Sequence, residues 1–144
     1  MGSSLLSAQD IDMYYASAKE MQKLDLLAVK SGLEISQMME LAGWHMLSLF
    51  KVLKIPQRSS VAVVCGKGNK AGDGLASARY LANHGMNVQV ILLSESISKD
   101  AKHQLNLVKK MKLSVYMLES IKAKQSIQKA DVVIDSLIGY HLKG

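Results

Sequence analysis

Nine residues in the middle of the chain combine glycine with polar side chains in a pattern suited to nucleotide binding. They read Gly66-Lys67-Gly68-Asn69-Lys70-Ala71-Gly72-Asp73-Gly74 and follow an apolar run, residues 61–65. Glycines let backbone amides approach a ligand closely, and a helix that begins beside them aims its N-terminus at an anion. This segment is the first candidate for a ligand site.

Part of the segment matches the G-x-G-x-x-G/A dinucleotide fingerprint through Gly66, Gly68 and Ala71. With Glu95 as a ribose ligand, the match would predict an ordinary NAD-dependent oxidoreductase. The pattern places Asp73 in the first turn of the next helix, where its carboxylate would repel a pyrophosphate. A hydroxyl, an amide or a cation suits Asp73 better, unless it only stabilises the helix dipole. The oxidoreductase is therefore a minor alternative.

The second candidate segment is residues 135–144, which follows the apolar run 132–134. Ligands of open parallel sheets bind beyond the carboxyl ends of the strands. Asp135 at such an end can hold a cation or handle a proton, and Lys143 can bind a phosphate. The structural alternatives are that Asp135 caps the next turn and that Lys143 is a frayed terminal residue.

Hydrophobic periodicity predicts two helices followed by alternating strands and helices. The two helices span residues 7–30, opened by a capping pair of Ser7 and Asp10, and 35–53, with Gly32 between them. His45 is interpreted as a packing residue of the second helix. The remaining elements are strand 61–65, helix 74–84, strand 87–93, helix 98–112, strand 113–118, helix 120–129 and strand 131–135. This order predicts an α/β fold, a Rossmann-like three-layer α/β/α sandwich with a mainly parallel sheet.

Length and composition indicate one globular domain over residues 1–144, with 49% hydrophobic residues. No apolar run approaches the roughly 18 residues that would span a bilayer, and the first residues do not form a signal peptide. We therefore expect a soluble, cytoplasmic protein. The four histidines lack metal-ligand spacing, so a zinc site is not expected. The single cysteine, Cys65, is interpreted as a small core residue, with a reactive thiol as the alternative.

Residues 99–129 contain eight lysines against Asp100 and Glu119, which accounts for the net charge of +6. The stretch has one aromatic residue and no arginine, so we interpret it as solvated helix faces and do not expect a nucleic-acid partner. Five of the nine methionines, Met13, Met21, Met38, Met39 and Met46, lie in the two leading helices. They are interpreted as core residues, and a homodimer through these helices is the alternative.

The glycine-rich segment, followed by Ala78-Arg79-Tyr80-Leu81, resembles the signature of the NAD(P)H-hydrate epimerase family, the YjeF N-terminal domain. That loop usually reads G-P-G-N-N-G-G-D-G and is followed by A-R-x-L. Met39-Glu40-Leu41-Ala42-Gly43 is similar to the family's M-E-x-A-G, and residues 130–139 extend the similarity. The resemblance implies a Rossmann-like sandwich and interconversion of the R and S epimers of NADHX and NADPHX, damaged nicotinamide nucleotides.

By position, the resemblance implies a substrate site built from two segments. One comprises Asn69, Lys70, Ala71, Gly72 and Asp73; the other comprises Gly139, Tyr140, His141, Leu142 and Lys143. Asp135 and Lys143 would be the catalytic residues. Asp135 also stands where the family places a ligand of a potassium ion, which makes potassium the implied cofactor.

Among the positions where the motif differs from the family pattern, Lys70 and Ala71 bear on the site. Lys70 stands where the family has an Asn whose amide oxygen helps to bind potassium, and an ammonium has no lone pair to offer a cation. Lys70 therefore either replaces the ion or abolishes its site. Ala71 replaces a glycine and would be strained if that position required a positive φ.

Family domains also continue beyond the position where this chain stops. The chain is expected to be a partial domain, either a fragment, a shortened relative or a protein that needs a partner. A non-catalytic nucleotide-binding or scaffold module of the same fold is the alternative function.

Overall fold

The computed structural model describes residues 15–140. The chain divides into two units, Met1–Gly32 and Leu33–Gly144. The first unit contains the helix α1, Ala18–Lys30. It begins later than predicted because Ser17 and Glu20 form a capping box, in which the Glu20 carboxylate accepts from the Ser17 amide at 2.7 Å. The prediction of helix at residues 15–17 was therefore wrong, and the Ser7 and Asp10 cap lies outside the described residues.

The second unit is built on a four-stranded parallel sheet with the strand order β3-β2-β1-β4. Its strands are β1 Ser60–Cys65, β2 Asn87–Leu92, β3 Ser114–Met117 and β4 Val132–Ser136. β1 is an unbroken run of small and β-branched apolar residues, buried from Val61 to Cys65, as expected of a strand covered on both faces. The predicted parallel sheet is confirmed.

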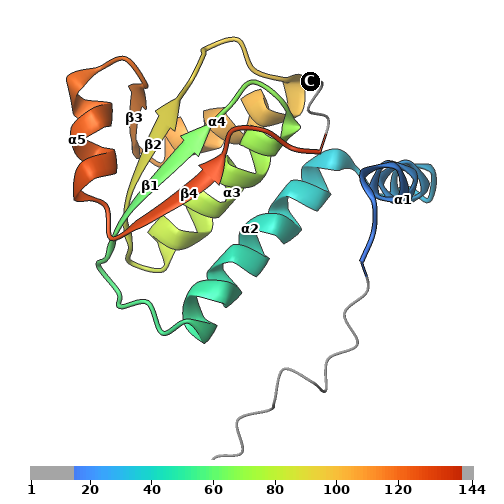
Figure 1. Ribbon diagram of the computed structural model, residues 1–144, viewed down its shortest axis with the longest axis horizontal. Helices are drawn as coiled ribbons and strands as arrows, with labels where there is room; N and C mark the ends of the chain where they lie inside the picture. Colours follow the sequence, from blue (N-terminus) through green and yellow to red (C-terminus); the bar gives the residue numbers. More distant parts are fainter. Residues whose placement is uncertain (1–14, 141–144) are drawn as a thin grey trace, which may run out of the picture. The chain divides into compact units, whose positions relative to one another are not determined.

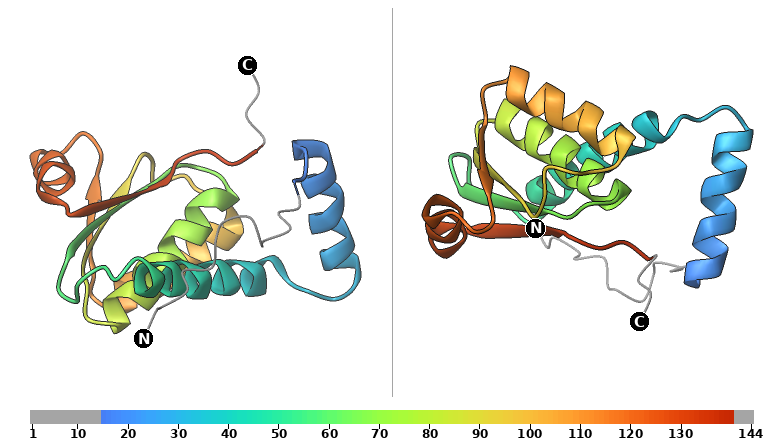
Figure 2. Two further views of the ribbon diagram at one scale, coloured as in Figure 1. Left: turned by 60° about the horizontal axis from the view of Figure 1, so that its bottom comes forward. Right: turned by 90° about the horizontal axis from the view of Figure 1, so that it is seen from above.

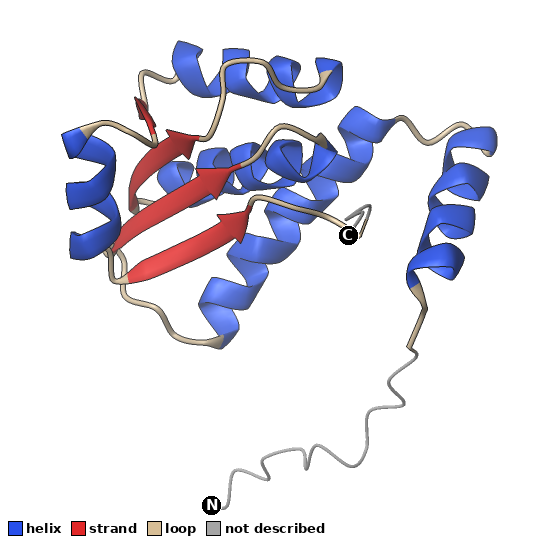
Figure 3. Cartoon of the chain, turned by 45° about the horizontal axis from the view of Figure 1, so that its top comes forward, coloured by secondary structure: helices blue, strands red, loops and turns tan. Residues whose placement is uncertain are grey.

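Helices cover both faces of the sheet (Figures 1 and 2). The helices α3, Asn69–Asn83, and α4, Lys99–Lys110, pack on one face, where Leu75, Leu81 and Val108 join the larger core. The helix α5, Ile121–Lys129, packs on the other face through Ala123. The expected three-layer sandwich is therefore confirmed, and Figure 3 shows its strands side by side between the helices.

The helix α2, Ile35–Val52, lies beside α3 on the same side of the sheet (Figure 1), where Leu47 and Phe50 join the larger core. The approach is close because Gly43 has no side chain: a Cβ there would lie 2.9 Å from the carbonyl carbon of Ala76 and would overlap Tyr80. Met39 and Phe50 are buried, which confirms the core interpretation for Met39. In α1, by contrast, no described residue is buried and Met21 is 36% exposed, so the core interpretation is wrong for Met21.

Three polar side chains tie α2, α3 and α4 together. Arg79 Nη1 donates to Glu40 Oε1 at 2.5 Å and to Gln104 Oε1 at 2.8 Å. Gln104 Nε2 donates in turn to Glu40 Oε1 at 3.0 Å, and Gln104 is almost fully buried. Burial raises the pKa of Glu40, but the hydrogen bonds from Gln104 and Arg79 and the charge of Arg79 outweigh it, so the net shift is downward.

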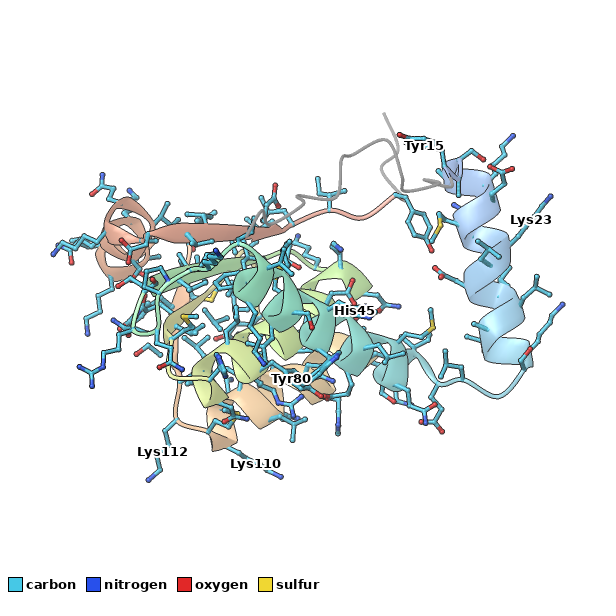
Figure 4. The ribbon with its side chains drawn as sticks, turned by 90° about the horizontal axis from the view of Figure 1, so that it is seen from below. Tyr15, Lys23, His45, Tyr80, Lys110 and Lys112 are labelled. Carbon is cyan, nitrogen blue, oxygen red and sulfur yellow. The ribbon has the colours of Figure 1, made fainter. Side chains whose placement is uncertain are left out.

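The lysine-rich stretch is divided by the fold. Its first part lies on α4 and the turn after it, where Lys110 and Lys112 point away from the sheet (Figure 4). Its last part lies on α5, on the opposite face of the sheet. The lysines are thus spread over separate helix faces. Among the described residues, no helix has the length and apolar character needed to cross a membrane.

The shift of Glu40 predicts how stability depends on pH. Because its folded-state pKa is lowered, the stabilisation is present above its unfolded pKa of about 4.5 and is lost as the pH falls through the folded value. We expect Glu40→Gln to cost about 1 kcal/mol at pH 7, since the Glu40 side chain stays 34% exposed and its charge is screened by solvent. Urea unfolding at pH 7 and pH 4 measures this cost: the difference in free energy of unfolding between wild type and variant should be smaller at pH 4. An exposed control, Glu95→Gln, should unfold with nearly the wild-type free energy at both pH values. If the difference for Glu40→Gln is the same at pH 4 as at pH 7, the stabilising role of the Glu40 carboxylate is contradicted.

Candidate functional site

The site lies where the direction of strand addition reverses. The chain runs from β1 outward to β2 and β3, then returns to place β4 on the other side of β1. At the carboxyl ends of β1 and β4, the Gly66 amide donates to the Ser136 carbonyl at 3.1 Å. A Cβ on Gly66 would overlap the Leu137 carbonyl, so the approach requires glycine. Such a reversal point is where open α/β sheets bind ligands.

The helix after β1 begins at Asn69, five residues earlier than the predicted start at Gly74. Gly68 is its N-cap in an extended conformation, and most of the glycine-rich segment is helical. The prediction was wrong because it took Gly72 as a loop residue. Packing explains both Gly72 and Gly74, since side chains there would overlap Met39 and Ser136. Asp73 is therefore in the second turn, and the interpretation that placed it in the first turn is also wrong.

The five residues expected to bind substrate on this helix divide into two groups. Asn69 and Lys70 are exposed and Asp73 is partly exposed, whereas Ala71 and Gly72 are buried. Ala71 is helical and lies outside the short set of described non-glycine residues with positive φ, so the strain considered for it does not arise. Its methyl group packs into the main core.

A pocket of about 250 Å³ opens beside these residues. It is bounded by α2, α3 and the end of β4, so that it draws on both candidate segments. Its lining consists of Ala42, His45, Met46, Leu49, Lys70, Asp73, Gly74, Ser77, Ile134, Asp135 and Ser136.

Lys70 and Asp73 form an ion pair on one wall of the pocket, with Lys70 Nζ 3.3 Å from Asp73 Oδ2. The backbone of this turn is fixed from β4, because Ser136 Oγ donates to the Lys70 carbonyl at 2.6 Å. Ser77 Oγ donates to the Asp73 carbonyl at 2.7 Å and lines the same pocket. A cation and a carboxylate are thus presented together at the switch point.

Asp135 occupies the expected place near the carboxyl end of β4, and its side chain is exposed. Its Oδ1 accepts from the Leu137 amide at 3.0 Å, so Asp135 does cap the following turn, and it also lines the pocket. Gly139 follows within van der Waals reach of Lys70, since a Cβ there would lie 3.7 Å from that of Lys70. Tyr140 is 39% exposed, and His141, Leu142 and Lys143 lie outside the described residues.

His45 is a pocket residue that the sequence interpretation assigned to packing. It is exposed on α2 (Figure 4) and lines the pocket with Ala42 and Leu49. Positions 42, 45, 46 and 49 share one face of a helix. A histidine at the centre of that otherwise apolar face was the available signal.

Two other candidates lie away from the pocket lining. Cys65 is fully buried, and burial raises the pKa of its thiol to about 12, which confirms the core interpretation over the reactive thiol. Glu95 is exposed in the loop after β2. Neither residue contributes to the wall that carries Lys70 and Asp135.

Comparison with known proteins identifies relatives over most of the chain. A family model described as "YjeF-related protein N-terminus" matches residues 35–144. The bifunctional NAD(P)H-hydrate repair enzyme Nnr of Moorella thermoacetica is 37% identical over 141 residues, covering 92% of this chain and 27% of that protein. The NAD(P)H-hydrate epimerase of Mycosarcoma maydis is 31% identical over 147 residues, covering 98% of this chain and 53% of that protein.

The crystal structure of the yeast protein ynu0 has the same fold, with a TM-score of 0.80 and 23% sequence identity. The match covers 92% of this chain and 59% of the yeast chain. The chain thus spans about half the length of the fungal relative and about a quarter of the bifunctional enzyme.

The packing of the glycines predicts opposite outcomes for one substitution at two positions. Gly74→Ser should cost roughly 1–3 kcal/mol, because its side chain would overlap Ser136 and press on Val63. Gly68→Ser should stay within about 0.5 kcal/mol of wild type or stabilise, since space is open there and serine suits an extended N-cap. Denaturant unfolding gives the free energy of unfolding of both variants. An equal loss of stability in the two would contradict the packing role of Gly74.

Proposed function

The chain belongs to the YjeF-related N-terminal family, and on that premise we propose that it forms the substrate-binding part of an NAD(P)H-hydrate epimerase. Its reaction would interconvert the R and S epimers of the hydrated nicotinamide in NADHX and NADPHX. The observation that carries the proposal is the pocket at the switch point, which Lys70 and Asp73 of α3 line together with Asp135 of β4. The curated relatives with epimerase or repair names support the choice of reaction.

The first turn of α3 suits the anionic part of such a substrate. A helix N-terminus carries partial positive charge and unpaired amides, and Gly68 leaves open space in front of it. Asn69 and Lys70 add an amide and an ammonium on the exposed side of this turn. We assign the nucleotide's phosphates to this end, with Gly139 to Lys143 as the second part of the site that the sequence leads us to expect.

Asp135 suits the end of the substrate that reacts, the hydrated nicotinamide. Inverting one carbon requires a bond there to break and re-form, with a proton moved to and from a basic group. Its carboxylate is exposed in the pocket and is oriented by the Leu137 amide. We therefore assign proton handling to Asp135, with Lys143 as the second catalytic residue expected from the sequence.

The alternative is a nucleotide-binding module of the same fold that does not catalyse the reaction. The observation that favours it is the Lys70 and Asp73 ion pair, which occupies the part of the pocket where the resemblance implies an ion site. This alternative predicts that the chain binds NADHX without accelerating epimerisation. The cytoplasmic location expected from the sequence stays a prediction.

We further propose that the N-terminal helices join two copies of the chain. Leu24, Leu26 and Leu27 of α1 are each more than half exposed, and the described part of α1 buries no residue. Light scattering should then report the mass of two chains. Leu24→Glu should reduce it to one, while the control Lys23→Glu, exposed in Figure 4, should not. A monomeric wild type would contradict this proposal without affecting the epimerase assignment.

Asp135→Asn should slow epimer interconversion by about a hundredfold or more, the range lost with a general acid or base. The asparagine oxygen can still accept from Leu137, so folding should be retained. The measurement is chromatography of separated (R)-NADHX and (S)-NADHX after mixing with protein.

The matched control is Asp131→Asn at the other end of β4, where the new side chain can still accept from the Ser60 amide. It should keep the wild-type rate. Equal rates for the wild type and a folded Asp135→Asn would remove Asp135 from the mechanism, and no acceleration by the wild type would favour the binding module.

A further inference from the structure

The pocket does not fit the potassium ion that the resemblance implies at Asp135. Hard cations are held by several oxygen ligands. The described residues contain no group of three or more His, Cys, Asp or Glu side chains able to hold a metal ion. At position 70, the side chain ends in an ammonium with three donors and no lone pair.

The oxygens of the wall are also engaged by donors from the protein itself. The Lys70 carbonyl accepts from Ser136 Oγ and the Asp73 carbonyl accepts from Ser77 Oγ. One carboxylate oxygen of Asp73 accepts from Lys70 Nζ, and one of Asp135 accepts from the Leu137 amide. Of these four donors only Lys70 Nζ carries a positive charge, so the ammonium is the group that an ion at this wall would have to displace.

The backbone and the side chain of Lys70 are both held in place, and its ammonium puts a positive charge on the same wall. Ser136 Oγ, at the end of β4, donates to the Lys70 carbonyl at 2.6 Å. Asp73, one turn later on α3, accepts from the Lys70 ammonium at 3.3 Å. The two side chains remain 45% and 32% exposed, so the pair faces the pocket without being sealed in the core. With Asp73 and Asp135 both on the wall, one ammonium leaves the set with a single net negative charge.

We propose that the Lys70 ammonium is the resident cation of this pocket and takes the electrostatic place of a monovalent metal ion. The inference rests on the proposed function, because it concerns the pocket assigned to the substrate. An ion beside the ammonium would meet like-charge repulsion that is strong at contact distances. The wild-type site is therefore independent of potassium, and removal of the ammonium makes room for the ion.

The test compares thermal unfolding of the 144-residue chain in potassium, sodium and choline chloride at equal ionic strength. Wild type should give the same Tm in all three salts. Lys70→Asn, which supplies an amide oxygen, should gain roughly 3 °C or more in potassium chloride alone, because an ion that binds only the folded state stabilises it. The control Lys99→Asn removes an exposed lysine from the first turn of α4, away from the pocket, and should respond as wild type does.

Either of two results overturns the proposal: a potassium-specific rise in Tm for wild type, or no such rise for Lys70→Asn. Epimerisation rates in the same salts give a separate readout. The wild-type rate should not depend on the salt, and Lys70→Asn should be faster in potassium chloride than in choline chloride. If no variant interconverts NADHX in any salt, the proposed function fails, while the Tm comparison still decides the role of Lys70.

Discussion

The close approach of α3 to the ends of β1 and β4 is the constraint on which the rest of the site depends. Gly74 permits it, because a side chain there would overlap Ser136, and Gly66 permits the end of β1 to approach Leu137, just after β4. Ser136 then joins the parts, since its hydroxyl donates to Lys70 and its carbonyl accepts from Gly66. Two segments more than 60 residues apart in the sequence thereby form one wall.

The outer wall of the pocket depends on a second, separate set of contacts. α2 is held against α3 by the close approach at Gly43 and by the hydrogen bonds among Glu40, Arg79 and Gln104. None of these four residues lines the pocket. The motifs that contain Glu40 and Arg79 therefore serve the site indirectly, by placing the face of α2 that carries His45 opposite Lys70 and Asp135.

Much of this arrangement could be predicted from the sequence, and the two predictions about the site that were wrong have a common cause. The strands and the parallel sheet follow from apolar runs separated by helical periodicity, a local signal that the fold does not override. The start of α3 was misplaced because glycine has two uses, in loops and where elements pack closely, and only the neighbours of Gly72 and Gly74 distinguish them. His45 was assigned to packing for the same reason, because the pocket that it lines is completed by residues of α3 and β4.

The glycine-rich motif contains both residues that pack in the fold and residues that line the pocket, which limits what a motif match can establish about function. Gly66, Ala71, Gly72 and Gly74 are buried and meet the backbone or the core, so they preserve the fold whether or not the protein catalyses a reaction. The side chains that line the pocket from this motif are Lys70 and Asp73, and Lys70 is one of the departures from the family pattern. Chemistry in this chain therefore depends on the balance of charge among Lys70, Asp73 and Asp135, which can change while the motif and the fold stay recognisable.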